Sequence, residues 1–215
     1  MPVRSLVAVC AFALAACGGG SGPSLGVTGP PSAQTVASNG SDFSGMQKCP
    51  ESGTWDNYLK AEQTKDPSQY QTDKSDWDSM KAAGANDSYI AVYAVNATDC
   101  GQFGGGNPSG KVAYVFAIRF KDSNSASTNF KSNSKSFHLS DTDVANLKAA
   151  GGTVEQGSTT GLGDNSIVVS INFGGSSIYI AFWQKNEFEV AEITFDVPTS
   201  DSGAVTKKIN DRITS

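Results

Sequence analysis

The residues to consider first for catalysis are the single histidine, His138, and the pair Ser132 and Lys135 just before it. A histidine acts as a general base when a nucleophile and an orienting group lie beside it. The sequence shows no such partner for His138, so we interpret it as a structural residue, at the surface or half-buried. Ser132 and Lys135 have the S-x-x-K spacing of a serine nucleophile with a basic lysine, but the companion S-D-N and K-T-G motifs are absent. We therefore predict no catalytic residue and no enzymatic activity.

Two further motifs bear on metals and cofactors. Asp73, Asp76 and Asp78 gather carboxylates, yet this stretch lacks the glycine and the terminal glutamate of a calcium loop, so we interpret it as a solvated helix face. Gly161–Asp164 (GLGD) precedes a strand, whereas a dinucleotide-binding glycine motif follows one, and Ser166 stands at the third glycine position. We interpret it as a turn in which Asp164 bonds nearby backbone amides. No metal or cofactor is expected.

The charge balance bears on partners. The formal net charge is −5, and it becomes −6 if a leader carrying Arg4 is removed, with 15 basic residues against 21 acidic ones. Nucleic-acid binding requires clustered Lys and Arg to displace counterions from phosphates. A nucleic-acid partner is therefore not expected.

The N-terminal 16 residues have the pattern of a secretory signal peptide. Arg4 supplies the positive charge and Leu6–Leu14 the apolar segment, which as a helix rises only about 13 Å and is too short to span a membrane. The next residues, Leu14-Ala15-Ala16-Cys17, resemble the bacterial lipobox. This resemblance implies a lipid on Cys17, a mature chain that begins there, and a location in the bacterial cell envelope, facing outside the cytoplasm. The alternative is ordinary cleavage near Ala16 with no role for Cys17.

The stretch after Cys17 is typical of a linker. Residues 18–41 carry no charge and are rich in Gly, Ser and Pro, so residues 17–41 are predicted to form a flexible tether with a lipidated cysteine at its start. The folded part would then be a single domain over residues 42–215.

Two cysteines remain after the leader and the anchor, Cys49 and Cys100. An even count in an oxidising compartment favours a disulfide between them. Zinc is the alternative, but the C-x-x-C spacing is missing and the chain has one histidine.

The folded part divides into helical and strand segments. Asp66-Pro67 and Gly84 have the residue types that begin and end a helix, which predicts a helix over 67–83. Ser140 with Asp143 forms a capping-box pattern for a helix that ends near Ala150. Further helices are predicted after Trp55, over 124–137 and at the C-terminus, and strands over 88–95, 111–120, 166–173, 178–184 and 187–197.

The last predicted strand changes its alternation. Phe188 and Val190 occupy even positions, whereas Ile193, Phe195 and Val197 occupy odd ones, which predicts a β-bulge near 191–192. Short connections make the last three strands antiparallel neighbours. The predicted fold is α+β, an antiparallel sheet of about five strands with helices on one face.

Residues 88–213, approximately, contain a helix, the GLGD turn, a three-stranded meander and a closing helix in that order. This order resembles the PsbP/Mog1-like lipoprotein and sensor modules of actinobacteria. The resemblance implies a non-catalytic module and carries over no site residue.

The expected function is that of a membrane-tethered, extracytoplasmic binding, sensor or accessory module. A concavity near Tyr114, Tyr179 and Trp183 would hold a small apolar ligand, unless these aromatic side chains belong to the core. A protein of the cell envelope is the other expected partner. The alternatives are a small envelope hydrolase and a structural or assembly lipoprotein.

Overall fold

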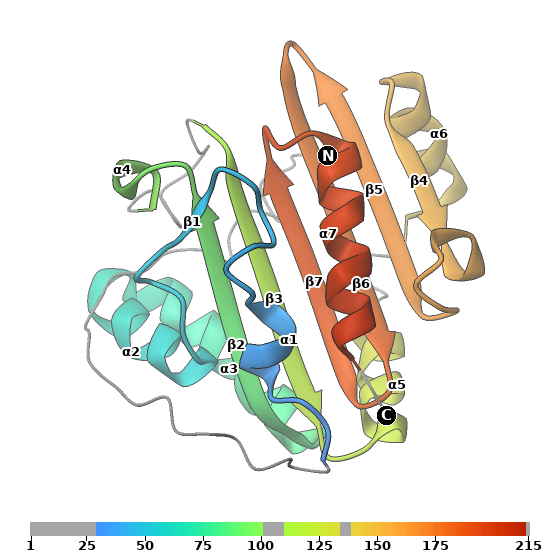
Figure 1. Cartoon of the computed structure of the whole chain (residues 1–215). Coiled ribbons are helices and arrows are strands. Elements are labelled where there is room, and N and C mark those ends of the chain that lie inside the picture. The colour runs from blue at the N-terminus through green and yellow to red at the C-terminus, as the bar shows by residue number, and fades with distance from the viewer. Residues whose placement is uncertain (1–28, 101–109, 134–138, 214–215) are drawn as a thin grey trace.

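One antiparallel sheet runs through the molecule, with strand order β1-β2-β3-β7-β6-β5-β4 (Figure 1). The computed structural model describes residues 29–100, 110–133 and 139–213. The strands are β1 (Gln47–Lys48), β2 (Ala85–Ala94), β3 (Val112–Phe120), β4 (Thr153–Gln156), β5 (Ser166–Phe173), β6 (Ser176–Lys185) and β7 (Phe188–Phe195). The predicted α+β class and the antiparallel meander are confirmed. Within these ranges the sheet has seven strands rather than about five, because the short edge strands β1 and β4 are too brief to show an alternating pattern.

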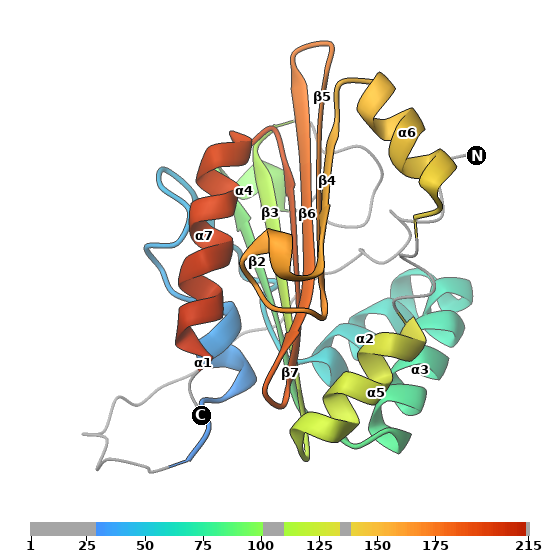
Figure 2. The ribbon, with the colours of Figure 1, turned by 90° about the vertical axis from the view of Figure 1, so that its right-hand side faces the viewer.

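Helices cover both faces of this sheet, which corrects the expectation of helices on one face (Figure 2). Helices α1 and α7 lie on one face, and α2, α3, α5 and α6 lie on the other. The helical segments are α1 (Ala33–Ala37), α2 (Trp55–Lys65), α3 (Pro67–Ala82), α4 (Ala97–Cys100), α5 (Ser123–Asn133), α6 (Asp141–Ala149), the 3-10 turn η2 (Gly157–Thr160) and α7 (Thr199–Arg212). Within the described residues, no helix is both long enough and apolar enough to cross a membrane.

The predicted helix boundaries hold where capping residues define them. The Asp66 side chain accepts hydrogen bonds from Ser68 N and Gln69 N at the start of α3. Gly84 follows the end of α3 with φ +108°, a conformation that glycine adopts without strain. At the start of α6, Ser140 and Asp143 form the predicted capping box. Local side-chain chemistry therefore fixes these ends.

The predicted tether is wrong over residues 33–37. These residues form α1, with the side chains of Ala33, Val36 and Ala37 fully buried against the sheet. Ser32 caps this helix by accepting from Thr35 N, and Ala33 N donates to Asp87 Oδ2 at 2.8 Å. The helix approaches closely because β2 and β3 present small side chains beneath it, among them Ala91, Ala113 and Ala117. The folded domain thus begins before residue 42.

The predicted bulge in β7 is also wrong, because the strand pairs with β3 and β6 in unbroken register. Since one face of this central strand is buried and the other is at least half-buried, apolar residues are allowed at either parity. The change in pattern comes from Glu192 and Thr194, which point toward α7 at positions where apolar residues were expected.

Two main cores result, one on each side of the sheet. One lies under α1 and α7, around Trp183, Phe188 and Ile209. The other lies under α2, α3 and α5, where Trp55, Trp77 and Phe116 pack together.

Candidate functional site

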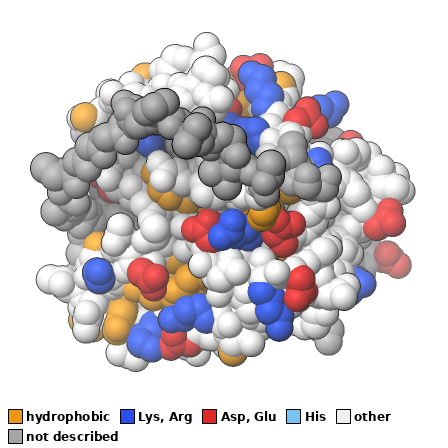
Figure 3. Space-filling model, turned by 60° about the horizontal axis from the view of Figure 1, so that its bottom comes forward, with side chains coloured by type: hydrophobic (Ala, Val, Ile, Leu, Met, Phe, Trp, Pro, Cys, Tyr) orange, Lys and Arg blue, Asp and Glu red, His pale blue; other side chains and the backbone are white. Residues whose placement is uncertain are grey.

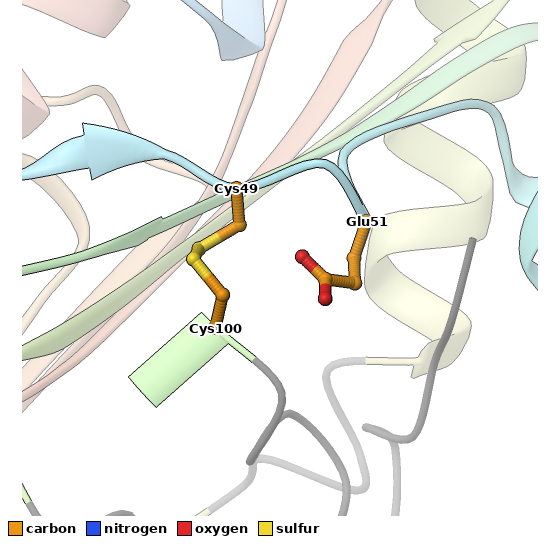
Figure 4. Close-up of side chains that lie close together, drawn as sticks. All are labelled: Cys49, Glu51 and Cys100. Atoms are coloured by element: carbon orange, nitrogen blue, oxygen red, sulfur yellow. A yellow bond between two sulfur atoms is a disulfide. The ribbon is translucent and has the colours of Figure 1, made fainter. Parts of the chain in front are cut away.

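The predicted disulfide between Cys49 and Cys100 is present, with Cα atoms 5.5 Å apart (Figure 4). Cys49 follows β1, and its backbone N–H donates to Val92 O of β2 at 2.8 Å. Cys100 ends α4, so the bond ties the segment after β1 to the segment after β2. Disulfides persist in oxidising compartments. This bond therefore indicates a location outside the cytoplasm.

Glu51 lies beside the disulfide, with a carboxylate oxygen within 4.8 Å of both sulfur atoms (Figure 4). Two cysteines and a carboxylate are a possible ligand set for zinc. A zinc ligand must be a thiolate, however, and both sulfur atoms are committed to the S–S bond. The three side chains therefore form no metal site in the disulfide-bonded protein.

The predicted lipidation site Cys17, together with His138 and Lys135, lies outside the described residues. Ser132 lies on the exposed surface of α5, where its hydroxyl donates to Thr128 O at 3.0 Å. This hydroxyl bonds the helix backbone, as serine in a helix often does. The S-x-x-K spacing thus gains no support from the position of its serine.

The three aspartates of α3 do not converge. Asp73 is buried, which corrects its interpretation as part of a solvated face, and it accepts hydrogen bonds from the Tyr58 hydroxyl and from Gln69 Nε2. Burial raises the pKa of Asp73, although these two hydrogen bonds lower it. Asp78 forms exposed ion pairs with Lys74 and Lys81 instead. Their carboxylates thus serve different contacts.

The Gly161–Asp164 segment is a turn, as predicted, with φ values of +72° at Gly161 and +111° at Gly163. Hydroxyl groups take part in two of its hydrogen bonds. Leu162 N donates to Thr160 Oγ1 at 3.0 Å, and Ser166 Oγ donates to Gly163 O. Because Leu162 is buried in the core, the turn serves the architecture.

The aromatic residues expected to line one concavity lie on two different faces. Tyr179 and Trp183 belong to the core beneath α7, whereas Tyr114 packs against Phe195 on the opposite face. All three are buried. They are core residues and do not line one concavity.

Sequence reasoning missed a buried carboxylate beneath α7. Glu192 of β7 has no exposed surface, and its Oε2 accepts a hydrogen bond from Thr206 Oγ1 of α7 at 2.8 Å. The Tyr179 hydroxyl lies 2.9 Å from the same Thr206 oxygen. Burial raises the pKa of Glu192 to about 8, while the Thr206 hydrogen bond and the charge of Arg212 lower it. Arg212 is itself paired with Asp42, at 2.9 Å.

A second buried carboxylate lies on the other face of the same strand. Glu189 is 3% exposed, and its Oε1 accepts a hydrogen bond from Asn129 Nδ2 of α5 at 2.9 Å. Burial raises the pKa of Glu189 to about 7, with the Asn129 hydrogen bond acting in the opposite direction. The two glutamates are separated by the sheet and sealed from water. Neither could act on a substrate in solution without a rearrangement of its helix.

The most distinctive accessible feature is a set of apolar side chains on the α5 side of the sheet. Residues directly opposite one another in an antiparallel ladder share a face, so the register places these side chains together. They are Val154, Val169, Ile171, Phe173, Ile178, Ile180, Ile193 and Phe195, and we call them the apolar face. Seven are half-buried and Phe173 is exposed. Contiguous exposed apolar surface marks interaction sites.

Burial decreases steadily along β5 within the apolar face. At the lower end of this strand Ile167 is buried beside Phe182, whose ring stacks on Phe130 of α5 at 4.6 Å between centroids. Val169 and Ile171 are half-buried, and Phe173 at the end of the strand is 54% exposed. The alternation of apolar residues thus continues beyond the part of the sheet that α5 covers.

The end of the molecule opposite the β5–β6 turn has a different character. Figure 3 shows basic and acidic side chains interspersed there, with small hydrophobic areas between them. The visible surface thus has no large area of a single sign of charge.

Comparison with known proteins yields little. No protein-family model matches the chain, and no curated protein matches it, so the resemblance to PsbP/Mog1-like modules stays a prediction. Among solved structures, the extracellular domain of PknH from Mycobacterium tuberculosis is similar over 63% of this chain and 69% of that chain, with 13% sequence identity and a TM-score of 0.41. A likeness of this size carries no argument about the site.

Proposed function

We propose that this chain is a non-catalytic binding module that works outside the cytoplasm, tethered to a membrane by a lipid on Cys17. The observation that carries the proposal is the apolar face, because a sheet surface of isoleucine and phenylalanine left partly open is typical of a contact surface. The disulfide supports the location. The sealed positions of Glu189 and Glu192 support a non-catalytic role.

The alternative of an envelope hydrolase requires an accessible nucleophile with a base beside it. The serine singled out by its spacing, Ser132, bonds a backbone carbonyl within its own helix. No observation on the described residues favours this alternative over binding.

Binding of the apolar dye bis-ANS to residues 18–215, the predicted mature chain without Cys17, tests the apolar face. We expect dye fluorescence with the unmodified chain and a loss of roughly half of it when Ile171 and Phe173 are both changed to serine. The matched control is Val95→Ser, because Val95 is the other large apolar side chain that is exposed in the described part of the chain, at 47%. Equal fluorescence from all three proteins, with equal circular dichroism, would contradict the proposal.

A further inference from the structure

The β5–β6 hairpin projects beyond the other strands, and its end carries the most exposed part of the apolar face (Figures 1 and 2). The sequence contains no charged residue between Asp164 and Lys185. Ile171 and Ile178 lie directly opposite each other, and Phe173 follows on the same face next to the Gly174-Gly175 turn. The opposite face of the hairpin presents Ser170, Asn172 and Ser177 instead. The projecting end is therefore amphipathic, with one apolar side.

We propose that Ile171, Phe173 and Ile178 form a docking site for a protein partner, which contacts them through an uncharged apolar surface and lies farther from the membrane than this chain does. This inference rests on the proposed function, since it names the partner of the apolar face.

The position of the tether directs the hairpin away from the membrane. Pro31 is close to the first described residue, and its carbonyl oxygen accepts a hydrogen bond from Arg119 Nη1 at 3.4 Å. Arg119 is the residue before the last one of β3. The hairpin lies beyond the opposite end of β3, because Val112 pairs with Phe195 and Phe195 pairs with Ile178. At about 3.3 Å per residue, Arg119 and the β5–β6 turn are about 35 Å apart along the strands. Both views place the end of β3 and the β5–β6 turn at opposite ends of the molecule.

This geometry disfavours the anchoring membrane as the occupant of the docking site. If the eleven residues between Cys17 and residue 29 form the predicted flexible tether, their r.m.s. reach is about 20 Å, which places the anchoring membrane nearer the Pro31 end than the hairpin. The hairpin also lacks the basic residues that bind anionic lipids. Its single aromatic residue at the turn, Phe173, is not one of the residues enriched at membrane interfaces, Trp and Tyr.

A small apolar ligand is disfavoured by the shape of the site. Ligand pockets are concave and bury most of the ligand surface. Phe173 stands at the end of a projecting hairpin, where more than half of its side chain is open. A protein surface buries such a residue by packing around it, and phenylalanine is among the aromatic residues enriched at protein interfaces.

Site-specific photo-crosslinking on the full chain tests the inference. Benzoylphenylalanine is introduced at position 173 or, as a matched control, at position 95, in cells that make the protein and process its anchor. We expect irradiation to join one other protein to the chain from position 173 and not from position 95. That protein, once purified, should bind residues 18–215, and Ile171→Ser should weaken the binding about tenfold or more while Val95→Ser leaves it unchanged.

Other results overturn the inference. Crosslinks to a second copy of this chain would assign the site to self-association, and crosslinks to lipid would assign it to a membrane. The inference also fails if position 173 gives no crosslink. It fails likewise if the purified protein binds the Ile171→Ser variant as tightly as the unmodified chain. If the dye experiment succeeds while this one fails, the binding function stands and only the partner is wrong. If both fail, the proposed function fails with it.

Discussion

Glu189 and Glu192 stand three residues apart on β7, yet they enter different cores on opposite faces of the sheet. Each carboxyl receives one hydrogen bond from a neighbouring helix, Glu189 from Asn129 and Glu192 from Thr206. Glu192 Oε1 has no hydrogen-bond partner among the described residues. A buried carboxylate with so few partners is costly to ionise. The protonated form is therefore favoured in the folded state, and stability depends on pH.

The substitution Glu192→Gln tests this dependence. Below about pH 4.5 the carboxyl is protonated in both the folded and the unfolded chain. Between about pH 4.5 and pH 8 the unfolded chain releases this proton while the folded chain keeps it, so the free energy of unfolding falls as pH rises. The loss is about 1.4 kcal/mol per pH unit at most for a single group. Glu192→Gln should reduce this fall, as measured by urea unfolding from pH 4 to pH 8.5.

The matched control is Glu155→Gln on β4, at an exposed position of the sheet edge. It should leave the unfolding curves close to those of the unmodified chain. Identical pH profiles for Glu192→Gln and the unmodified chain would show that the buried position of Glu192 has no influence on folding. Glu189, with a pKa of about 7, contributes a part of the dependence that remains in the variant.

At the scale of elements, α1 joins the chain segment nearest the predicted anchor to the body of the protein. Its three buried side chains fill the space above the alanines of β2 and β3. The loop after it is held by the pair between Asp42 and Arg212 and by the Phe43 ring, 5.0 Å from Tyr93. The contacts thus link the N-terminal segment to both β2 and α7.

The change Val36→Asp should destabilise the protein by about 3 kcal/mol, because it places an unpaired charge in the core. The control Gln34→Asp introduces the same residue two positions earlier, at an exposed site in the first turn of α1, where a negative charge is favourable. Thermal unfolding of the two variants measures the difference. If residues 17–41 were a flexible tether throughout, both variants would unfold at the same temperature as the unmodified chain.

The elements that could be predicted are those whose sequence carries a local physical signal. Asp66, Ser140 and Gly84 mark helix ends through their own hydrogen bonds or backbone conformation, and the alternation of Ile167 to Phe173 marks β5. Helix α1 was missed because a five-residue helix gains its stability from the sheet beneath it, which no local pattern reveals.

The candidate site also has a part that could be predicted from local sequence and a part that could not. The register that gathers the apolar face follows from alternation and short turns, so its residues were visible as strand residues. The apolar face stays partly open because α5 covers only a part of it. The position of α5 on the sheet is a property of the tertiary structure. Glu192 was hidden because a glutamate among alternating strand residues is normally placed on a solvated face, and in this fold α7 covers that face.

At the scale of the whole molecule, the two ends of the sheet differ in what they carry. The segment that leads from the predicted anchor enters beside Arg119, while the uncharged hairpin projects from the other end. The disulfide joins the residue after the edge strand β1 to the end of α4. The predicted tether at one end and the proposed contact surface at the other suit the proposed module, which would present the hairpin away from the membrane.

This orientation requires a lipid on Cys17, which the substitution Cys17→Ala tests. Each buried methylene contributes about 0.8 kcal/mol and two or more acyl chains give stable anchoring, so the unmodified protein should sediment with membranes and incorporate labelled palmitate. Cys17→Ala should lose the label and shift to the soluble fraction. Cys10→Ala is the matched control, because Cys10 lies in the predicted leader and its loss should change neither result. Unmodified protein that is unlabelled and water-soluble would contradict the anchor, and with it the direction in which the hairpin points.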